Sequence, residues 1–280
     1  MKRFRQIFIT VVISLLLFSA LAYGDSWTGN KRLTNNAGNS SSPATAVDGS
    51  NIYVVWEDNT LGNLEIYFKK SDDGGATWTT NKRLTTNADA RCSSIAVNGP
   101  NIYVVWTAYA TPGSFEIYFK KSDDGGVTWA TNKRLTNNAG ISWLPTIAAD
   151  GPNIYVVWYD DTPGNPEIYF KKSDDGGATW TTNKRLTNNA GYSYVPAIAV
   201  DGSNICVVWE DYTPGNYEIY FKKSDDGGAT WATNKRLTNN AGDSQYPAIA
   251  ADGSNIYVVW QNFIPTPANY EIYFTKGVLF

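Results

Sequence analysis

Short apolar segments separated by glycine-rich turns recur along the chain at nearly constant intervals. The hexapeptide NIYVVW, once as NICVVW, begins at residues 51, 101, 153, 204 and 255, and EIYF begins at residues 65, 116, 167, 218 and 271. Residues 52–56 are apolar on both faces, as in a strand covered on both sides, whereas residues 65–70 alternate more. No segment after residue 24 has a helical apolar period. The pattern therefore predicts an all-β fold.

The spacing of these segments indicates one repeat used five times. NKRLT begins at residues 30, 81, 132, 183 and 234, always 51 residues apart. In the first complete unit we expect strands at residues 44–47, 52–56, 65–70 and 77–85. Four strands in about 40–50 residues is the size of a propeller blade. Residues 25–280 are thus expected to form a single domain, a five-bladed β-propeller of four-stranded antiparallel blades.

The ends of the chain are complementary within this repeat. Residues 26–34, SWTGNKRLT, correspond to a lone fourth strand, and the C-terminal unit has three strands without a fourth. We expect the N-terminal strand to complete the last blade, which would remove unpaired edges. A solenoid is the alternative, but it does not need complementary ends.

The first 24 residues have the pattern of a secretory signal peptide. Lys2, Arg3 and Arg5 precede an uncharged apolar run at residues 7–22, and small residues precede Asp25. We expect cleavage after residue 24 and a secreted, periplasmic or cell-surface protein with no membrane span. The alternative is an uncleaved membrane anchor, although the run is shorter than the roughly 20 residues of a span.

Composition narrows the chemistry. The chain contains no histidine, which excludes Ser-His-Asp and Cys-His nucleophiles and histidine-ligated zinc. Its net charge of −3 argues against nucleic acid as a partner. Cys92 and Cys206 are the only thiols, and we expect no disulfide between them. We expect no cofactor and no metal, and a monomer whose partner is a glycan or an extracellular protein.

An octapeptide between the third and fourth expected strands has a recognisable form. SDDGGATW or SDDGGVTW begins at residues 71, 122, 173 and 224 and resembles the Asp-box of bacterial neuraminidase (BNR) repeats, which occur in sialidases and in other propellers. Short Asp and Ser side chains bond backbone N–H groups within a turn, and Gly permits positive φ. A calcium loop would need more widely spaced carboxylates and a closing Glu. We interpret the boxes as structural, with the positions Ser71, Asp73, Gly75, Trp78, Ser122, Asp124, Gly126, Trp129, Ser173, Asp175, Gly177, Trp180, Ser224, Asp226, Gly228 and Trp231.

The repeats differ from one another mainly in two connections. The turns between first and second strands (such as DGSN) and the Asp-boxes hardly vary, and both lie at one end of a blade. The connections at the other end vary and define the variable face, where loops on a rigid scaffold commonly bind ligands. It comprises residues 39–43, 89–94, 141–145, 192–196 and 243–247, and residues 57–64, 107–115, 159–166, 210–217 and 261–270.

The variable face is rich in aromatic and acidic residues. Aromatic planes beside carboxylates suit sugar rings or peptides; the alternative is that these rings pack between blades after recent duplication. The ligand-binding candidates are Tyr109, Trp143, Tyr159, Tyr194, Tyr212, Tyr246, Phe263 and Arg91. A glycoside hydrolase needs two facing carboxylates roughly 5–10 Å apart. The catalytic candidates are Glu57, Asp58, Asp160, Asp161, Glu210 and Asp211.

The sialidase resemblance implies an arginine cluster for the substrate carboxylate, an Arg-Ile-Pro motif and usually six blades. Here five arginines occupy the same KRLT position, Arg91 alone lies in a variable connection, no Arg-Ile-Pro occurs and five repeats are counted. The sequence therefore favours a binding module for glycans or a surface protein over a sialidase. A sialidase-like glycoside hydrolase and a structural component of the cell envelope or matrix remain as alternatives.

Overall fold

The computed structural model describes residues 27–86, 89–111, 113–266 and 268–279. Every regular element in these ranges is a β-strand, which confirms the all-β prediction. The chain divides into two units, Met1–Leu33 and Thr34–Phe280, and all strands belong to the second. The predicted signal peptide, residues 1–24, lies outside the described residues. The described ranges contain no helix of the length and apolarity that a membrane crossing requires.

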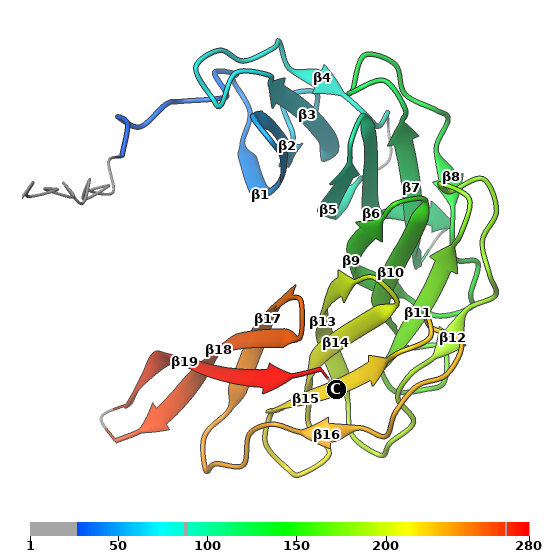
Figure 1. Ribbon diagram of the computed structural model, residues 1–280, viewed down its shortest axis with the longest axis vertical. Helices are drawn as coiled ribbons and strands as arrows, with labels where there is room; N and C mark the ends of the chain where they lie inside the picture. The colour runs from blue at the N-terminus through cyan, green and yellow to red at the C-terminus, as the bar shows by residue number, and fades with distance from the viewer. Residues whose placement is uncertain (1–26, 87–88, 112, 267, 280) are drawn as a thin grey trace, which may run out of the picture. The chain divides into compact units, whose positions relative to one another are not determined.

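The strands form five antiparallel sheets in the order of the sequence (Figure 1). The first four sheets have four strands, as predicted for propeller blades, and the fifth has three. By sheet, the strands are β1 (Ser40–Asp48), β2 (Asn51–Asp58), β3 (Glu65–Ser71), β4 (Lys82–Arg83); β5 (Arg91–Asn98), β6 (Asn101–Thr111), β7 (Ser114–Ser122), β8 (Lys133–Arg134); β9 (Ser142–Asp150), β10 (Asn153–Asp160), β11 (Glu167–Ser173), β12 (Lys184–Arg185); β13 (Ser193–Asp201), β14 (Asn204–Asp211), β15 (Glu218–Ser224), β16 (Lys235–Arg236); and β17 (Ser244–Asp252), β18 (Asn255–Pro265), β19 (Ala268–Val278).

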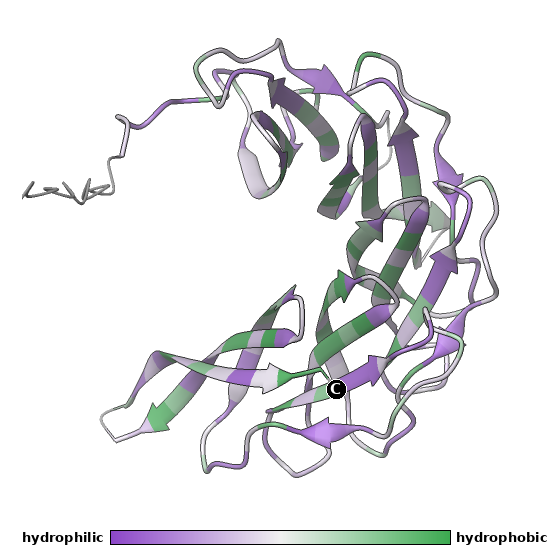
Figure 2. Cartoon of the chain, viewed as in Figure 1, coloured by the Kyte–Doolittle hydropathy of each residue, from purple (hydrophilic) through white to green (hydrophobic). Residues whose placement is uncertain are grey.

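The core lies between neighbouring sheets. Four apolar clusters each join one sheet to the next, and the first strands β1, β5, β9, β13 and β17 contact one another in that order. Trp106, Trp158 and Trp209, on the second strands, are fully buried. Burying one large apolar side chain contributes about 1.5–3 kcal/mol. Figure 2 shows the resulting contrast between apolar inner strands and the polar outermost strands β8, β12 and β16.

The outermost strand is much shorter than predicted. Residues 77–85 were expected to form it, but only Lys82 and Arg83 pair with β3. The chain still follows β3, because Thr79 N donates to Lys70 O at 2.9 Å and Ile66 N donates to the Thr85 hydroxyl at 2.9 Å. A side-chain oxygen thus replaces a backbone carbonyl, and the regular ladder ends.

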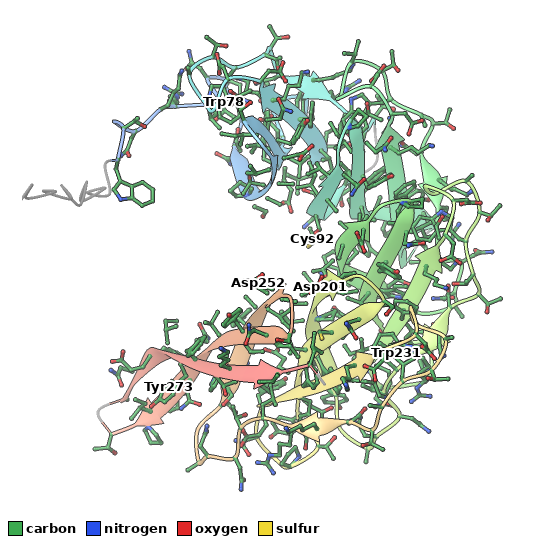
Figure 3. All side chains as sticks on the ribbon, in the orientation of Figure 1. Trp78, Cys92, Asp201, Trp231, Asp252 and Tyr273 are labelled. Carbon is green, nitrogen blue, oxygen red and sulfur yellow. The ribbon has the colours of Figure 1, made fainter. Side chains whose placement is uncertain are left out.

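The Asp-box is a turn closed by its own side chains. The Ser71 hydroxyl donates to Asp73 at 2.7 Å and accepts the Gly75 N–H at 2.8 Å. Asp73 also accepts the N–H and hydroxyl of Thr77, at 2.8 and 2.6 Å, and these bonds lower its pKa to about 2. Trp78 Nε1 donates to Gly75 O at 3.0 Å. The other three boxes repeat this geometry, and Figure 3 marks the tryptophans of the first and fourth.

Lysines bond the second, third and fourth sheets to the sheet before each of them. Lys120 Nζ on β7 donates to Leu84 O of the first sheet at 2.6 Å, and Lys171 and Lys222 make the same bond to the preceding sheet at 2.5 Å. Burial lowers the pKa of these lysines. The first lysine of the FKK segment, which the fifth repeat replaces with Thr275, is therefore a structural cation in these three sheets rather than a ligand group.

The predicted closure by the N-terminal strand stays a prediction. Residues 27–33 have no strand assignment, and β19 pairs with β18 alone among the described strands. Two apolar side chains of β19, Ile272 and Phe274, are 75 % and 61 % exposed, whereas their counterparts Ile66 and Phe68 are buried. Ile66 and Phe68 belong to the apolar cluster between the first and second sheets, so the exposure of Ile272 and Phe274 marks a face of the fifth sheet that no other described sheet covers.

Candidate ligand-binding face

Strand register places the variable connections at one end of every sheet. In the first sheet Asp58 pairs with both Ser40 and Glu65, while Asn51 pairs with Asp48 at the opposite end, beside Ser71. The Asp-boxes and the short DGSN-type turns therefore share the second end. The variable face is a real surface of the fold, formed by the starts of the first and third strands and the ends of the second strands.

Each first strand enters the variable face through a β-bulge, which the sequence did not predict. The pairing of each first strand with the second has one register shift, and the residues within it include a non-glycine residue at positive φ. The residues and angles are Ser42 (50°), Cys92 (53°), Leu144 (51°), Val195 (47°) and Tyr246 (52°). This conformation costs about 1 kcal/mol or more per residue. Five equivalent strained positions mark the same place in each sheet.

Three of the six catalytic candidates are occupied by structural bonds. Asp160 is fully buried and accepts bonds from the amide of Asn138, from the Ser142 hydroxyl at 2.7 Å and from Thr162 N at 3.0 Å. Asp58 and Asp211 accept the corresponding bonds. Burial alone would raise the pKa of Asp58, but its bonds to Thr60, Ser40 and Trp56 lower it. Several donors of the protein thus already bond each of these carboxylates.

Asp161 has a similar local task. Its Oδ1 accepts the N–H of Ile141 at 2.5 Å, as the Asn59 side chain accepts the N–H of Asn39 at 2.7 Å in the first sheet. Both bonds tie a second-strand end to the preceding connection. An amide performs the same task in the first sheet, so this position does not require a carboxylate.

A further set of buried carboxylates was not singled out in the sequence. Glu116 is fully buried and accepts Arg134 Nη2 at 2.7 Å and Asn138 N at 3.0 Å. Glu167 and Glu218 make the same bonds with Arg185 and Arg236. The sequence could have revealed these Glu–Arg pairs, because the Glu of EIYF and the Arg of KRLT recur together in the repeats. These arginines hold connections in place and do not converge on a ligand.

Glu57 and Glu210 are the catalytic candidates that remain. Each is buried at the end of a second strand and reaches the next sheet, where it accepts the N–H of the bulge residue. Glu57 accepts Cys92 N at 2.6 Å, and Glu210 accepts Tyr246 N at 3.0 Å. The pKa of Glu210 is raised to about 7, chiefly by burial. The bond from the Tyr246 N–H lowers this pKa, whereas the negative charge of Asp243 raises it further.

Tyrosine side chains surround Glu210. Burial and the charges of Glu210 and Asp243 raise the pKa of Tyr217. Burial and nearby charges, that of Glu210 among them, raise the pKa of Tyr194. Tyr212 packs edge-on against Tyr217 at 5.0 Å. The Tyr246 side chain is 60 % exposed. We refer to Glu210, Asp243, Tyr194, Tyr212, Tyr217 and Tyr246 as the Glu210 cluster.

Other candidate aromatics pack on one another, across sheets or within one sheet. Tyr159 of the third sheet meets Tyr194 of the fourth at 5.0 Å, edge to face. Burial, with Tyr194, Asp161 and Cys92 nearby, raises the pKa of Tyr159 to about 12. Trp143 contacts Phe115 at 4.6 Å, and Phe263 contacts Tyr270 at 5.3 Å. Some of these rings therefore pack between sheets, as the alternative interpretation expects, and ligand binding by the exposed ones stays a prediction.

Arg91 and Tyr109 lie away from the Glu210 cluster, on the second sheet. Both line a hollow of about 350 Å³ next to the first sheet. Arg91 forms an ion pair with Asp89 at 3.0 Å. Cys92, labelled in Figure 3, follows Arg91 at the start of β5, and both cysteines are free. The described residues contain no group of three or more acids, cysteines or histidines placed to hold a metal ion.

Comparisons with known proteins were consistent with this architecture. The model of the BNR repeat-like domain family matches residues 24–259. A partial relative, the Protein TolB homolog of Chlorobaculum tepidum, is 30 % identical over 130 residues, which cover 46 % of this chain and 25 % of that protein. The chain thus spans a quarter of the length of this curated relative.

Solved structures share the fold at low sequence identity. The GH93 alpha-L-arabinofuranosidase of Fusarium graminearum, in complex with arabinobiose, has a TM-score of 0.59 at 15 % identity, over 82 % of this chain and 79 % of that one. The endo-arabinase of Bacteroides thetaiotaomicron has a TM-score of 0.54 at 18 % identity, over 85 % and 94 %. A Hadza microbial sialidase has a TM-score of 0.50 at 13 % identity, over 85 % and 65 %. The predicted resemblance to sialidase-like propellers is confirmed.

Proposed function

Because the chain belongs to the BNR repeat-like domain family, we propose that it is a glycan-binding β-propeller that uses its variable face. The observation that carries this proposal is the Glu210 cluster, where exposed tyrosine rings accompany a buried carboxyl. Aromatic faces stack on the apolar faces of sugars, and a few fixed polar groups then orient the hydroxyls. The similar solved structures are named as enzymes of arabinose-containing and sialic acid glycans, which supports a glycan ligand.

A glycan array followed by calorimetry tests the proposal. The purified protein should bind a defined group of glycans, and Tyr246→Ala should weaken the binding at least tenfold, because its exposed ring supplies the stacking surface. Val127→Ala is the matched control: Val127 is 62 % exposed but belongs to an Asp-box at the opposite end of the sheets. Silence against all glycans would contradict the proposal, and glycan binding that Tyr246→Ala leaves unchanged would remove the Glu210 cluster from it. A captured surface protein would then become the better candidate.

Glycoside hydrolysis is the second candidate function, and the pKa of Glu210 favours it. A carboxyl with a pKa of about 7 is partly protonated at neutral pH, as a general acid must be. The second carboxyl that hydrolysis requires would be Asp243, whose charge already acts on Glu210. Turnover of aryl arabinofuranosides or aryl sialosides that Glu210→Gln abolishes would establish the enzyme. A binding protein would show no turnover and would retain glycan affinity in Glu210→Gln.

The complete propeller is a further part of the proposal. In the first four sheets a fourth strand carrying KR covers the third, and the segment with Lys31 and Arg32 is the remaining copy of that sequence. We propose that it pairs with the outer edge of β19 and completes the fifth blade. The pairing of β19 with β18 alone among the described strands supports this, because an unpaired edge strand is open to pairing with other chains.

Export is likewise proposed from the N-terminal pattern. Residues 1–24 would direct secretion, and the mature chain would begin at Asp25. Intact mass and N-terminal sequencing of the protein from whole cells and from the medium or periplasm test this. An N-terminus at Met1 in the membrane fraction would instead indicate an anchor.

A further inference from the structure

The hollow beside Arg91 lies on the variable face, between the first two sheets. Its volume is about 350 Å³, within the roughly 300–1,000 Å³ of small-molecule sites. The first sheet lines it with Asn59, Asn63 and Leu64. The second sheet contributes the charged and aromatic groups, and its own sequence departs from the repeat at this place.

The second sheet lacks the structural bonds that the other sheets make here. Ala108 stands where the other sheets have Asp58, Asp160, Asp211 and Asn262, and Ala90 stands where they have a serine, which is buried in the third, fourth and fifth sheets. The connection from Leu84 to Cys92 is one residue shorter than the one from Leu135 to Leu144. These changes remove side-chain volume and chain length next to the hollow.

The change leaves a buried polar group without a bond. Trp56 Nε1 and Trp158 Nε1 donate to Asp58 and Asp160 at 3.3 and 3.4 Å. Trp106 Nε1, with Ala108 in place of the acid, is buried and has no partner among the described residues, and the hydroxyls of Ser93 and Thr107 in the same sheet have none either. In the fifth sheet Trp260 Nε1 alone of these positions is without a partner among the described residues. Such a group costs free energy. A repeat that departs from its own pattern at a cost in stability is characteristic of a functional site.

Tyr109 forms a fixed platform at the hollow. It lies in the hairpin of β6 and β7, which continues beyond the equivalent hairpin of the first sheet. Its hydroxyl accepts Gly113 N at 2.5 Å, and its ring packs edge-on against Phe115 at 4.9 Å. The side chain is nevertheless 46 % exposed. A tyrosine whose hydroxyl and ring are both fixed by contacts, and whose side chain is still partly exposed, is suited to stacking on a ring-shaped ligand.

Arg91 and Asp89 supply a neutral pair of polar groups. Arg91 Nε and Nη2 donate to the Asp89 carboxylate at 3.0–3.2 Å. The side chains are 41 % and 39 % exposed. The two N–H groups of Arg91 Nη1 have no bond among the described residues, and carboxylate oxygens accept more than one donor. The pair therefore presents donors and acceptors together, with no net charge.

We propose that this hollow is a binding subsite for a neutral sugar, whose ring stacks on Tyr109 while its hydroxyls bond Arg91, Asp89 and the amides of Asn59 and Asn63. The proposal rests on glycan binding by the variable face and adds a location and a sugar class. An acidic sugar fits less well, because its carboxylate would lie beside Asp89, which already neutralises the arginine. A neutral polyol uses both members of the pair.

The test is calorimetric titration and saturation-transfer NMR with four probes. Lactose and arabinobiose represent neutral sugars; 3′-sialyllactose and digalacturonate represent acidic ones. At least one neutral probe should bind, and Tyr109→Ala and Arg91→Ala should each weaken it at least tenfold. Leu61→Ala is the matched control, because Leu61 is 63 % exposed in the adjacent connection but does not line the hollow.

The Asp89→Asn variant decides the sugar class by the sign of its effect. Loss of an acceptor should weaken a neutral probe, whereas loss of a negative charge should strengthen an acidic one. Preferential binding of an acidic probe, strengthened in Asp89→Asn, would overturn the proposal.

The remaining outcomes separate this subsite from the proposed function. Glycan binding that depends on Tyr246 but not on Tyr109 or Arg91 overturns the subsite and leaves the proposed function intact. Binding that depends on Tyr109 and Arg91 but not on Tyr246 supports the subsite and removes the Glu210 cluster from the binding surface. Absence of binding to every probe and every arrayed glycan overturns both.

Discussion

The Glu210 carboxylate accepts the backbone N–H of Tyr246 at 3.0 Å, across the boundary between the fourth and fifth sheets. The N–H belongs to a residue at a φ of 52°, inside a β-bulge, so it has left the regular ladder. Glu57 makes the same contact with Cys92 between the first and second sheets. A buried carboxylate thus links two neighbouring sheets at the variable face in both places.

Stability should depend on pH through Glu210. Its pKa rises from 4.5 to about 7 on folding, so the folded state holds the proton more tightly than the unfolded chain. This contribution is complete below about pH 4.5 and is lost as the pH rises through 7, on the order of 3 kcal/mol in total. Denaturant unfolding of wild type and Glu210→Gln should show the variant gaining relative stability from pH 5 to pH 8. Parallel pH profiles would contradict a raised pKa.

Asp160 should tolerate an amide but not deletion of its side chain. Asp160→Ala leaves the Asn138 amide, the Ser142 hydroxyl and the Trp158 Nε1 without their acceptor, which costs about 2–4 kcal/mol. Asp160→Asn should cost about 1 kcal/mol, because Asn262 fills this place in the fifth sheet and accepts the same kind of bonds. Urea unfolding measures both. Equal losses in the two variants would show that the charge, rather than the acceptor geometry, is required.

The two glycines of one Asp-box should differ in their response to substitution. A Cβ at Gly126 would lie 2.7 Å from the Phe68 ring of the preceding sheet, at a φ of 88°. A Cβ at Gly125, at a φ of 67°, would meet only the flexible end of Lys70 at 3.8 Å. We expect Gly125→Ala to cost about 1 kcal/mol from backbone strain and Gly126→Ala about 2–4 kcal/mol. Thermal unfolding of the pair measures the difference, and similar values would exclude the inter-sheet contact.

A double-mutant cycle tests the proposed completion of the fifth blade. Repeat register pairs Arg32 with Glu271 as Arg134 pairs with Glu116 at 2.7 Å. Arg32→Ala and Glu271→Ala should show a coupling energy of about 1–2 kcal/mol in unfolding experiments, similar to that of Arg134→Ala with Glu116→Ala. The second cycle is the internal control. Additive effects of the first pair, with coupling in the second, would show that the N-terminal segment does not cover β19.

Much of the fold was predictable because its information is local to the 51-residue repeat. The doubly apolar residues 52–56 and the turn residues around Gly74 and Gly75 specify a strand and a tight turn wherever they occur. The outermost strand was predicted too long, because nothing in residues 77–85 shows that the Thr85 hydroxyl replaces a backbone carbonyl. Such a replacement depends on the position of the neighbouring strand.

For the candidate site, the sequence identified the surface and its acidic residues, and the structure decided which of these residues does what. The sequence determined which face varies, since comparison of the repeats needs no coordinates, and it identified every acid at the ends of the second strands. It could not separate Glu210 from Asp211, which are adjacent in the chain. Successive strand residues point to opposite faces, so Asp211 bonds its own sheet and Glu210 reaches the next one. Sheet-to-sheet packing and the bulge at Tyr246 decided that difference, because both arise from contacts far apart in the sequence.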